Sequence, residues 1–329
     1  MMTSLCRKRP WLWHVSRSLA AIFCLALCLA ITGVAYQYVA SFLNRVRNPP
    51  PGQLVDVGGY RMHLYCLGAG SPTVILDSGL SDPWLSWHKV QPKVAEFTRV
   101  CSYDRAGLGW SDPSPNARTS KVFARELHTL LRNAKVRPPF LLVGHSMGGY
   151  DVRMFASLYR SEVAGMVLVD ATHPDIFDRS PKIKRATEEW FRSFERKEYE
   201  MFFGISRLQH SCGTTHDDFP DMRRAIECRE SYLRETRAEC VSVLGESADQ
   251  VRATGSLGKL PLVVISEDPN RNSKEFLSAF EQSQAELEEL STNSQRIIAT
   301  KSGHQIQLER PDVVIQAIQN VIKRSKSSR

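Results

Sequence analysis

An apolar run leads directly into a Gly-x-Ser-x-Gly turn at residues 140–149, and this junction constrains the fold more than any other feature of the chain. The run is short and uncharged, which is typical of a buried parallel strand. Beyond the turn, apolar residues recur at helical spacing from Tyr150 to Tyr159. Gly144 and Gly148 leave room for a tight turn at Ser146, because a Cβ at either position would clash. The sequence therefore predicts an exposed Ser146 hydroxyl at the carboxyl end of a parallel sheet.

A serine presented in this way needs a base and an orienting acid, and in this architecture they follow it in the order acid, then histidine. His304 comes after a strand-like run at 295–300, where a base would approach the serine. His173 is the competing histidine. His145 lies on the strand before the serine and should point away from it. We predict that His304 is the base.

Two backbone N–H groups are expected to bind an oxyanion. One belongs to Met147, at the amino terminus of the helix that follows the serine. The other comes from the loop after the third strand. Thr73–Asp77 has the pattern of that strand and Ser78-Gly79 opens the loop, so Leu80 N–H is the predicted second donor. A plain Ser-Gly turn is the alternative.

The acid has more than one candidate. Asp170 ends the sixth apolar strand, and Asp268, with Glu267 beside it, follows the seventh. A carboxylate at the carboxyl end of a parallel strand faces the ligand crevice in either case. Asp170 is tight against its strand, whereas Asp268 lies in a polar loop before Pro269.

From about Leu54 to Lys323 the chain resembles the α/β-hydrolase-fold serine hydrolases of the esterase or lipase kind. Three segments carry this resemblance. They are Gly144-His145-Ser146-Met147-Gly148-Gly149, Tyr103-Asp104-Arg105-Ala106-Gly107-Leu108-Gly109-Trp110-Ser111 and Ser302-Gly303-His304. The resemblance implies hydrolysis of carboxylic esters or related acyl groups without a cofactor. It also implies structural roles for Asp104 and Arg105. The usual acid of the family lies further past the seventh strand than Asp268, which favours Asp170, a position that some lipase-like members use.

The strand and helix patterns predict an α/β fold with a mostly parallel central sheet flanked by helices. An antiparallel pair comes first, at residues 54–57 and 62–66. About 85 residues separate the sixth strand from the seventh, too many for a bare loop. This insert has helical patterns at 188–203 and 221–244. The resemblance implies that it forms a lid over the serine. Its aromatic side chains either line a substrate pocket or pack the insert onto the body.

The expected organisation has six parts. They are a basic N-terminal segment (1–17), a transmembrane anchor or signal sequence (18–44), a Pro-rich linker (45–53), the hydrolase core (54–173 and 257–323), the helical lid (174–256) and a basic tail (324–329).

No charged residue occurs between Arg17 and Arg45, and Leu19–Tyr36 is almost wholly apolar. A bilayer-spanning helix takes ~20 such residues. More positive charge lies before the stretch than after it, which predicts a cytoplasmic amino terminus and an extracytoplasmic catalytic domain. The alternative is a secreted protein, released by cleavage of a signal sequence near Gly33-Val34-Ala35.

The cysteines suggest limited covalent cross-linking. Cys66 and Cys101 lie in strand-like runs and are predicted to be buried thiols. Cys212 and Cys228 are predicted to form a disulfide in the insert, with Cys240 as the rival partner. His210, Cys212 and His216 do not complete a four-ligand set, so no metal is expected.

The net charge of +8 is concentrated at the two ends of the chain, and no nucleic-acid-binding motif accompanies it. The sequence predicts a membrane-anchored serine esterase that forms an acyl-enzyme on a small ester with an apolar acyl or aromatic group. One alternative passes the acyl group to an alcohol or peroxide, as an acyltransferase or perhydrolase does. The other is a non-catalytic binding protein on the same fold.

Overall fold

The computed structural model describes residues 10–213, 218–271 and 274–327. The chain divides into two units. The larger unit consists of Pro49–Arg196 and Arg229–Arg329, and the smaller one of Met1–Asn48 and Lys197–Cys228.

The larger unit is built on a sheet that contains eight strands within the described residues, in the order β1-β2-β4-β3-β5-β6-β7-β8. The strands β1 and β2 pair antiparallel, as do β2 and β4, and all other neighbours are parallel. The strands are β1 (Gln53–Asp56), β2 (Arg61–Leu67), β3 (Thr73–Asp77), β4 (Val100–Tyr103), β5 (Phe140–His145), β6 (Val163–Val169), β7 (Leu262–Ser266) and β8 (Ser294–Ile298). The predicted mostly parallel sheet is confirmed.

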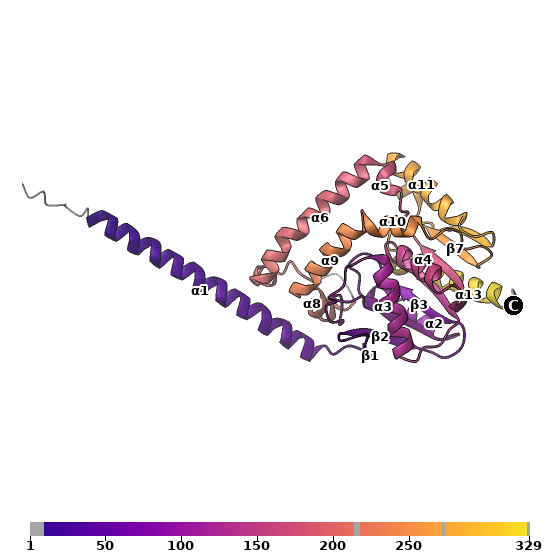
Figure 1. The fold of residues 1–329 in the computed structure, drawn as a ribbon, viewed down its shortest axis with the longest axis horizontal. Coiled ribbons are helices and arrows are strands. Elements are labelled where there is room, and N and C mark those ends of the chain that lie inside the picture. The colour runs from indigo at the N-terminus through magenta and orange to yellow at the C-terminus, as the bar shows by residue number, and fades with distance from the viewer. Residues whose placement is uncertain (1–9, 214–217, 272–273, 328–329) are drawn as a thin grey trace, which may run out of the picture. The chain divides into compact units, whose positions relative to one another are not determined.

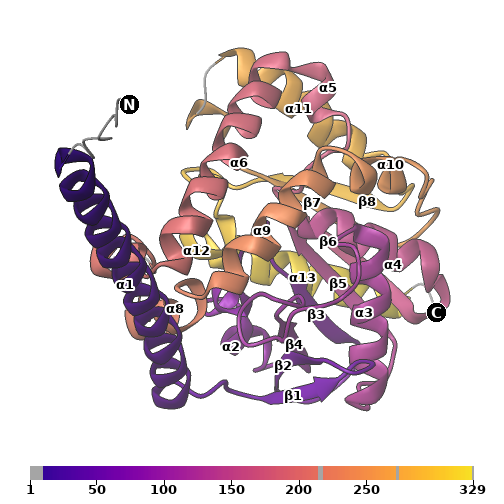
Figure 2. The same ribbon diagram turned by 60° about the vertical axis from the view of Figure 1, so that its left-hand side comes forward.

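Helices cover both faces of the sheet. Alternate strand residues, such as Val74 and Leu76, form one core layer with α2 (Gln91–Val94) and α13 (Pro311–Ser327). The helices α3 (Ser120–Asn133) and α4 (Gly148–Leu158) pack together on the opposite face (Figures 1 and 2). The buried β5 run and the one-sided apolar pattern of α3 explain this layering, because each element must bury its apolar face.

Six helices lie between β6 and β7 in the described part of the chain. They are α5 (Ile176–Arg179), α6 (Pro181–Phe202), α7 (Ile205–Leu208), α8 (Pro220–Glu227), α9 (Glu230–Val243) and α10 (Glu246–Arg252). The long connection is therefore helical, as its length required. Its function as a lid stays a prediction. The remaining helices of the larger unit are α11 (Lys274–Glu288), α12 (Ile306–Glu309) and the short 3₁₀ turns η1 (Trp84–Trp87), η2 (Arg160–Glu162) and η3 (Pro269–Arg271).

The prediction of free thiols at Cys66 and Cys101 is wrong. The two residues face each other across the antiparallel pair of β2 and β4, with 4.0 Å between their Cα atoms, and they form a disulfide. Directly opposed residues of antiparallel strands bring their side chains close together. The register that pairs them depends on strands far apart in the sequence.

The smaller unit contains α1 (Pro10–Arg47) together with α7 and α8. Its predicted disulfide between Cys212 and Cys228 is confirmed, and Cys240, in the larger unit, is a buried free thiol. The segment Trp13–Arg47 is long and apolar enough to cross a membrane. The helix continues to Arg47, into the expected linker, because no proline or glycine lies between Gly33 and Pro49.

The helix α13 continues into the predicted basic tail (324–329) and ends at Ser327. Arg324 anchors this end by donating from Nη1 to the Leu262 carbonyl at 3.2 Å.

Candidate active site

Ser146 lies in the turn between β5 and α4. Its backbone φ is 51°, a conformation that residues other than glycine rarely adopt. A Cβ on Gly144 would come within 2.5 Å of the Gly148 carbonyl oxygen. A Cβ on Gly148 would come within 2.7 Å of the Asp77 and Ser78 carbonyl oxygens. The two glycines therefore allow the turn to pack between sheet and helix, as their spacing predicted.

Three predicted residues from separate elements meet at this turn. His304 Nε2 lies 3.0 Å from Ser146 Oγ, and His304 Nδ1 lies 2.6 Å from Asp170 Oδ2. The Asp170 side chain is fully buried, and its Oδ1 accepts the Glu267 N–H at 2.8 Å. Each oxygen of the Asp170 carboxylate therefore has its own partner. One contacts the backbone N–H after β7, and the other contacts the imidazole.

The alternative acids lie elsewhere in the same loops. Asp268 Oδ2 accepts the Lys301 N–H at 2.7 Å, and its Oδ1 accepts the Asn270 N–H at 2.9 Å. The bond from Lys301 ties the loop after β7 to the loop after β8. Glu267 is buried beside the site, where its charge acts on His304.

The carboxylates around His304 set its proton affinity. Desolvation lowers the pKa of His304, but the hydrogen bond and charge of Asp170 outweigh it, helped by Glu267 and Asp82. The net effect raises the pKa of His304 above its ordinary value of 6.5. The imidazole is thus a stronger base than a free histidine.

His145 supports the loop that carries His304, a role that the sequence did not predict. Its Nε2 lies 2.9 Å from the His304 carbonyl oxygen, and its Nδ1 lies 3.3 Å from Gln307 Nε2. Burial, and then the charge of His304, hold the pKa of His145 well below its ordinary value. A neutral ring that accepts from Gln307 and donates to the carbonyl fits both contacts. The position of His145 directly before Ser146 was the available signal.

The two predicted oxyanion donors lie in loops that line one cavity with Ser146 and His304. Among the hydrogen bonds of the described residues, none uses the N–H of Leu80 or of Met147. Both donors are therefore available to a bound group.

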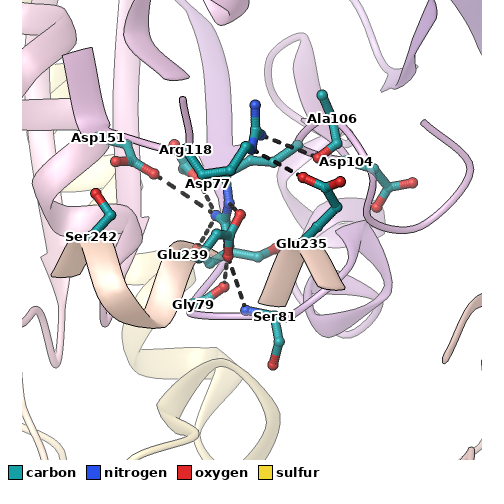
Figure 3. A network of polar contacts seen from close by, with 12 residues as sticks. Asp77, Gly79, Ser81, Asp104, Ala106, Arg118, Asp151, Glu235, Glu239 and Ser242 are labelled. Carbon is teal, nitrogen blue, oxygen red and sulfur yellow. Dashed lines mark hydrogen bonds and ion pairs between the residues drawn. The ribbon is translucent and has the colours of Figure 1, made fainter. Parts of the chain in front are cut away.

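A buried ionic network holds the loop that carries Leu80. Arg105 donates to the carbonyl oxygens of Ser78 and Gly79 and forms ion pairs with Asp77 at 3.0 Å and with Glu239 at 2.8 Å. Glu239 comes from α9, and its Oε2 accepts the Ser81 N–H at 3.3 Å (Figure 3).

Each partner in this network is buried, and the resemblance had already implied a structural role for Arg105. Desolvation opposes the charge of Arg105, but Glu239 and Asp77 raise its pKa well above its ordinary value. Glu239 is a further residue that the sequence did not reveal, because it lies 134 positions from Arg105.

Two cavities of about 340 Å³ each adjoin Ser146 and His304. The first is lined by the loop that carries Leu80, by Met147, and by Trp190, Phe191 and Val243 from the insert. The second extends past Asp170 to the apolar side chains Ile176, Ile183 and Phe280. Ser146 thus lines two adjoining, largely apolar spaces.

The competing histidine, His173, has other partners. His173 Nε2 lies 3.3 Å from Glu286, and burial, with the charges of Arg179 and Arg153, lowers the pKa of His173 to about 4. Cys212 is bonded to Cys228, so it does not offer a thiolate, and His216 lies outside the described residues.

Comparisons with known proteins agree with this architecture. The family profile of the alpha/beta hydrolase fold matches residues 72–217. The chain is 25% identical over 254 residues to the uncharacterized protein YqjL of Bacillus subtilis, which covers 77% of this chain and 85% of that one. It is 34% identical over 117 residues to a soluble epoxide hydrolase of Corynebacterium sp., across 35% of this chain and 39% of that one.

Among solved structures, the chain superposes on a thermophilic esterase from Thermogutta terrifontis with a TM-score of 0.62. The two are 22% identical, and the superposition covers 83% of this chain and 98% of the esterase. The likeness supports the fold, and the neighbours include both esterases and epoxide hydrolases.

Proposed function

Because the chain has the α/β-hydrolase fold, we propose that it is a serine hydrolase that cleaves carboxylic esters through a Ser146–His304–Asp170 triad. The observation that carries this proposal is the 3.0 Å separation of His304 Nε2 from Ser146 Oγ, with Asp170 on the other ring nitrogen. A base in this position can remove the hydroxyl proton as the oxygen attacks a carbonyl carbon.

In the first half-reaction, Ser146 Oγ bonds to the ester carbon while its proton passes to His304 Nε2. The carbonyl oxygen becomes an oxyanion, which the unoccupied N–H groups of Met147 and Leu80 stabilise. Asp170 stabilises the imidazolium. The tetrahedral intermediate then collapses, and His304 gives the proton to the departing alcohol.

In the second half-reaction, water attacks the acyl-enzyme and His304 takes one of its protons. Collapse of this second intermediate releases the carboxylic acid and returns the proton to Ser146. Each step uses the same imidazole, so the elevated pKa of His304 matters in both.

The identity of the nucleophile favours esters over epoxides. A serine oxygen that opened an epoxide would form an ether, and an ether is not released by attack of water at a carbonyl. A carboxylate nucleophile would instead form an ester intermediate that water can hydrolyse. Position 146 carries a serine, and no carboxylate replaces it in this turn.

The two cavities support an ester with an apolar group on each side of the carbonyl. The acyl group and the alcohol leave the carbonyl carbon in different directions, and each adjoining space has about 340 Å³. Apolar walls favour aliphatic or aromatic groups over charged ones.

We also propose that α1 anchors the chain in a membrane with the catalytic domain on the extracytoplasmic side. Arg7, Lys8, Arg9 and Arg17 precede the apolar stretch, against Arg45 and Arg47 after it. The two disulfides support this orientation, because disulfides persist in oxidising compartments.

Turnover of p-nitrophenyl esters, compared with opening of styrene oxide, tests the proposed reaction on the full chain in detergent. We expect ester hydrolysis that Ser146→Ala abolishes and that Ser193→Ala, at an exposed serine on α6, leaves unchanged. Epoxide opening without ester hydrolysis would refute the proposal.

A further inference from the structure

Two polar residues of α1, Gln37 and Ser41, contact the part of the insert that belongs to the same unit, Lys197–Cys228. We call this part the insert segment. Gln37 is 2% exposed, and its amide accepts from Arg207 Nε at 2.8 Å and donates to the Cys228 carbonyl at 2.8 Å. Arg207 Nη2 also donates to Ser41 Oγ at 2.8 Å. These bonds fix α7, and the disulfide-bonded Cys228, against one level of α1.

A close backbone approach strengthens the same contact. A Cβ on Gly33 would come within 2.4 Å of the Phe203 carbonyl oxygen. Only glycine allows the end of α6 to pack this closely on α1, and small residues serve this purpose where helices meet in membranes. The contact between α1 and this segment therefore extends from Gly33 to Ser41.

The length of α1 places that contact at the edge of a bilayer. At a rise of about 1.5 Å per residue, Gly33 lies about 24 Å and Ser41 about 36 Å beyond Arg17, the last charged residue before the apolar stretch. A hydrocarbon core is about 30 Å thick. If it begins just beyond Arg17, its far boundary falls between Gly33 and Ser41.

The insert segment exposes large apolar side chains at this level. Tyr199 is 70% exposed, Leu208 is 66% exposed, and Phe202 and Ile205 are 36% and 39% exposed. We call these four residues the α6–α7 apolar surface. On α1, Tyr38, Val39 and Phe42 are exposed at the same level. Large apolar side chains that gather on an exposed face often mark a binding surface.

We propose that the α6–α7 apolar surface inserts into the lipid leaflet on the Arg45 side of the membrane, as a second membrane contact beside α1. The inference depends on the proposed membrane span of α1. Phe203 and Gly204, which lie between the residues of this surface in the sequence, pack on α1 at Gly33 and Tyr36. The aromatic members of the surface suit the interface between acyl chains and water. The partner is the lipid bilayer itself, bound through apolar contact within the leaflet.

Photolabelling of the full chain in phosphatidylcholine vesicles tests this proposal. The probe is a phosphatidylcholine with a diazirine on its acyl chain, and labelled tryptic peptides are mapped by mass spectrometry. We expect labels on α1 and on residues 198–207, which contain Tyr199, Phe202 and Ile205. Residues 238–252 are the control, because Val241 is 71% exposed but belongs to the larger unit.

The Phe202→Glu/Ile205→Glu double variant should reduce labelling of 198–207 to the level of the control peptide while α1 stays labelled. Val241→Glu should change neither signal. Labelling of α1 with residues 198–207 at the control level in the wild-type chain would overturn the proposed contact alone. Release of the chain by alkaline carbonate, with α1 unlabelled, would overturn the membrane span and the contact together.

Discussion

At the scale of single residues, Asp170 and Asp268 offer a matched pair of isosteric changes. Asp170→Asn should lower kcat by about 10⁴, because the amide cannot hold His304 in the required tautomer or stabilise the imidazolium. Asp268→Asn should change kcat little, since its contacts join two loops and do not include His304. Single-turnover kinetics with a p-nitrophenyl ester measure both effects, and a reversed ranking would assign the acid to Asp268.

The raised pKa of His304 predicts the pH dependence. Only the neutral imidazole accepts the serine proton, so activity is lost as pH falls through the pKa of His304. Because Asp170, Glu267 and Asp82 raise that pKa, the acid limb of kcat/KM should have its midpoint above 6.5. Glu267→Gln removes one of these charges and should move the midpoint downward. A midpoint that is unchanged by Glu267→Gln would contradict this electrostatic account.

Ser146 and His304 could be predicted because their signals are local: a glycine-flanked turn after a strand, and a histidine after the last strand. The choice of Asp170 as the acid was harder to make from the sequence, since two strand ends carry acidic residues. Only the folded loops show that Asp170 contacts the His304 imidazole. The support that His145 gives to the His304 loop was not predicted, because strand alternation says nothing about a ring at the strand end that turns toward a neighbouring loop.

At the scale of elements, Glu239 of α9 contacts the loop that carries Leu80, the predicted second oxyanion donor. Glu239→Gln removes the charge that pairs with Arg105 and weakens the bond to Ser81 N–H. We expect kcat to fall about tenfold with little change in KM, because loss of a whole oxyanion donor costs ~10²–10³.

Glu235→Gln is the matched control, because Glu235 lies one turn earlier on α9 and pairs with Arg118 instead. Both changes should lower the melting temperature, since each removes a buried charge partner. Equal effects of the two variants on kcat would show that Glu239 acts on stability alone.

Two contacts between distant elements were not predicted from the sequence, and for the same reason. The disulfide between Cys66 and Cys101 depends on the register of β2 against β4, and the Glu239–Arg105 pair depends on where α9 packs. Periodicity predicts that a strand or helix exists, but not which residue of a distant element it faces. The alternation of strands and helices along the chain, by contrast, followed from their apolar patterns.

At the scale of the whole molecule, the proposed orientation predicts protease access from outside. In spheroplasts that express the full chain, added protease should digest the domain after Arg47, while a cytoplasmic marker protein stays intact. The charge bias across α1 and the two disulfides are the physical reasons. Protection of the domain until the membrane is lysed would mean the opposite orientation.

If Ser146 is the nucleophile of an acyl-transferring triad, a reagent that reacts with activated serines should modify it. The full chain is treated with a fluorophosphonate, and the modified residue is mapped by mass spectrometry. We predict a single adduct on Ser146 that is absent in Ser146→Ala and forms far more slowly in His304→Ala, because the base activates the hydroxyl. An adduct on another residue, or a Ser146→Ala variant that hydrolyses esters at the wild-type rate, would contradict the account.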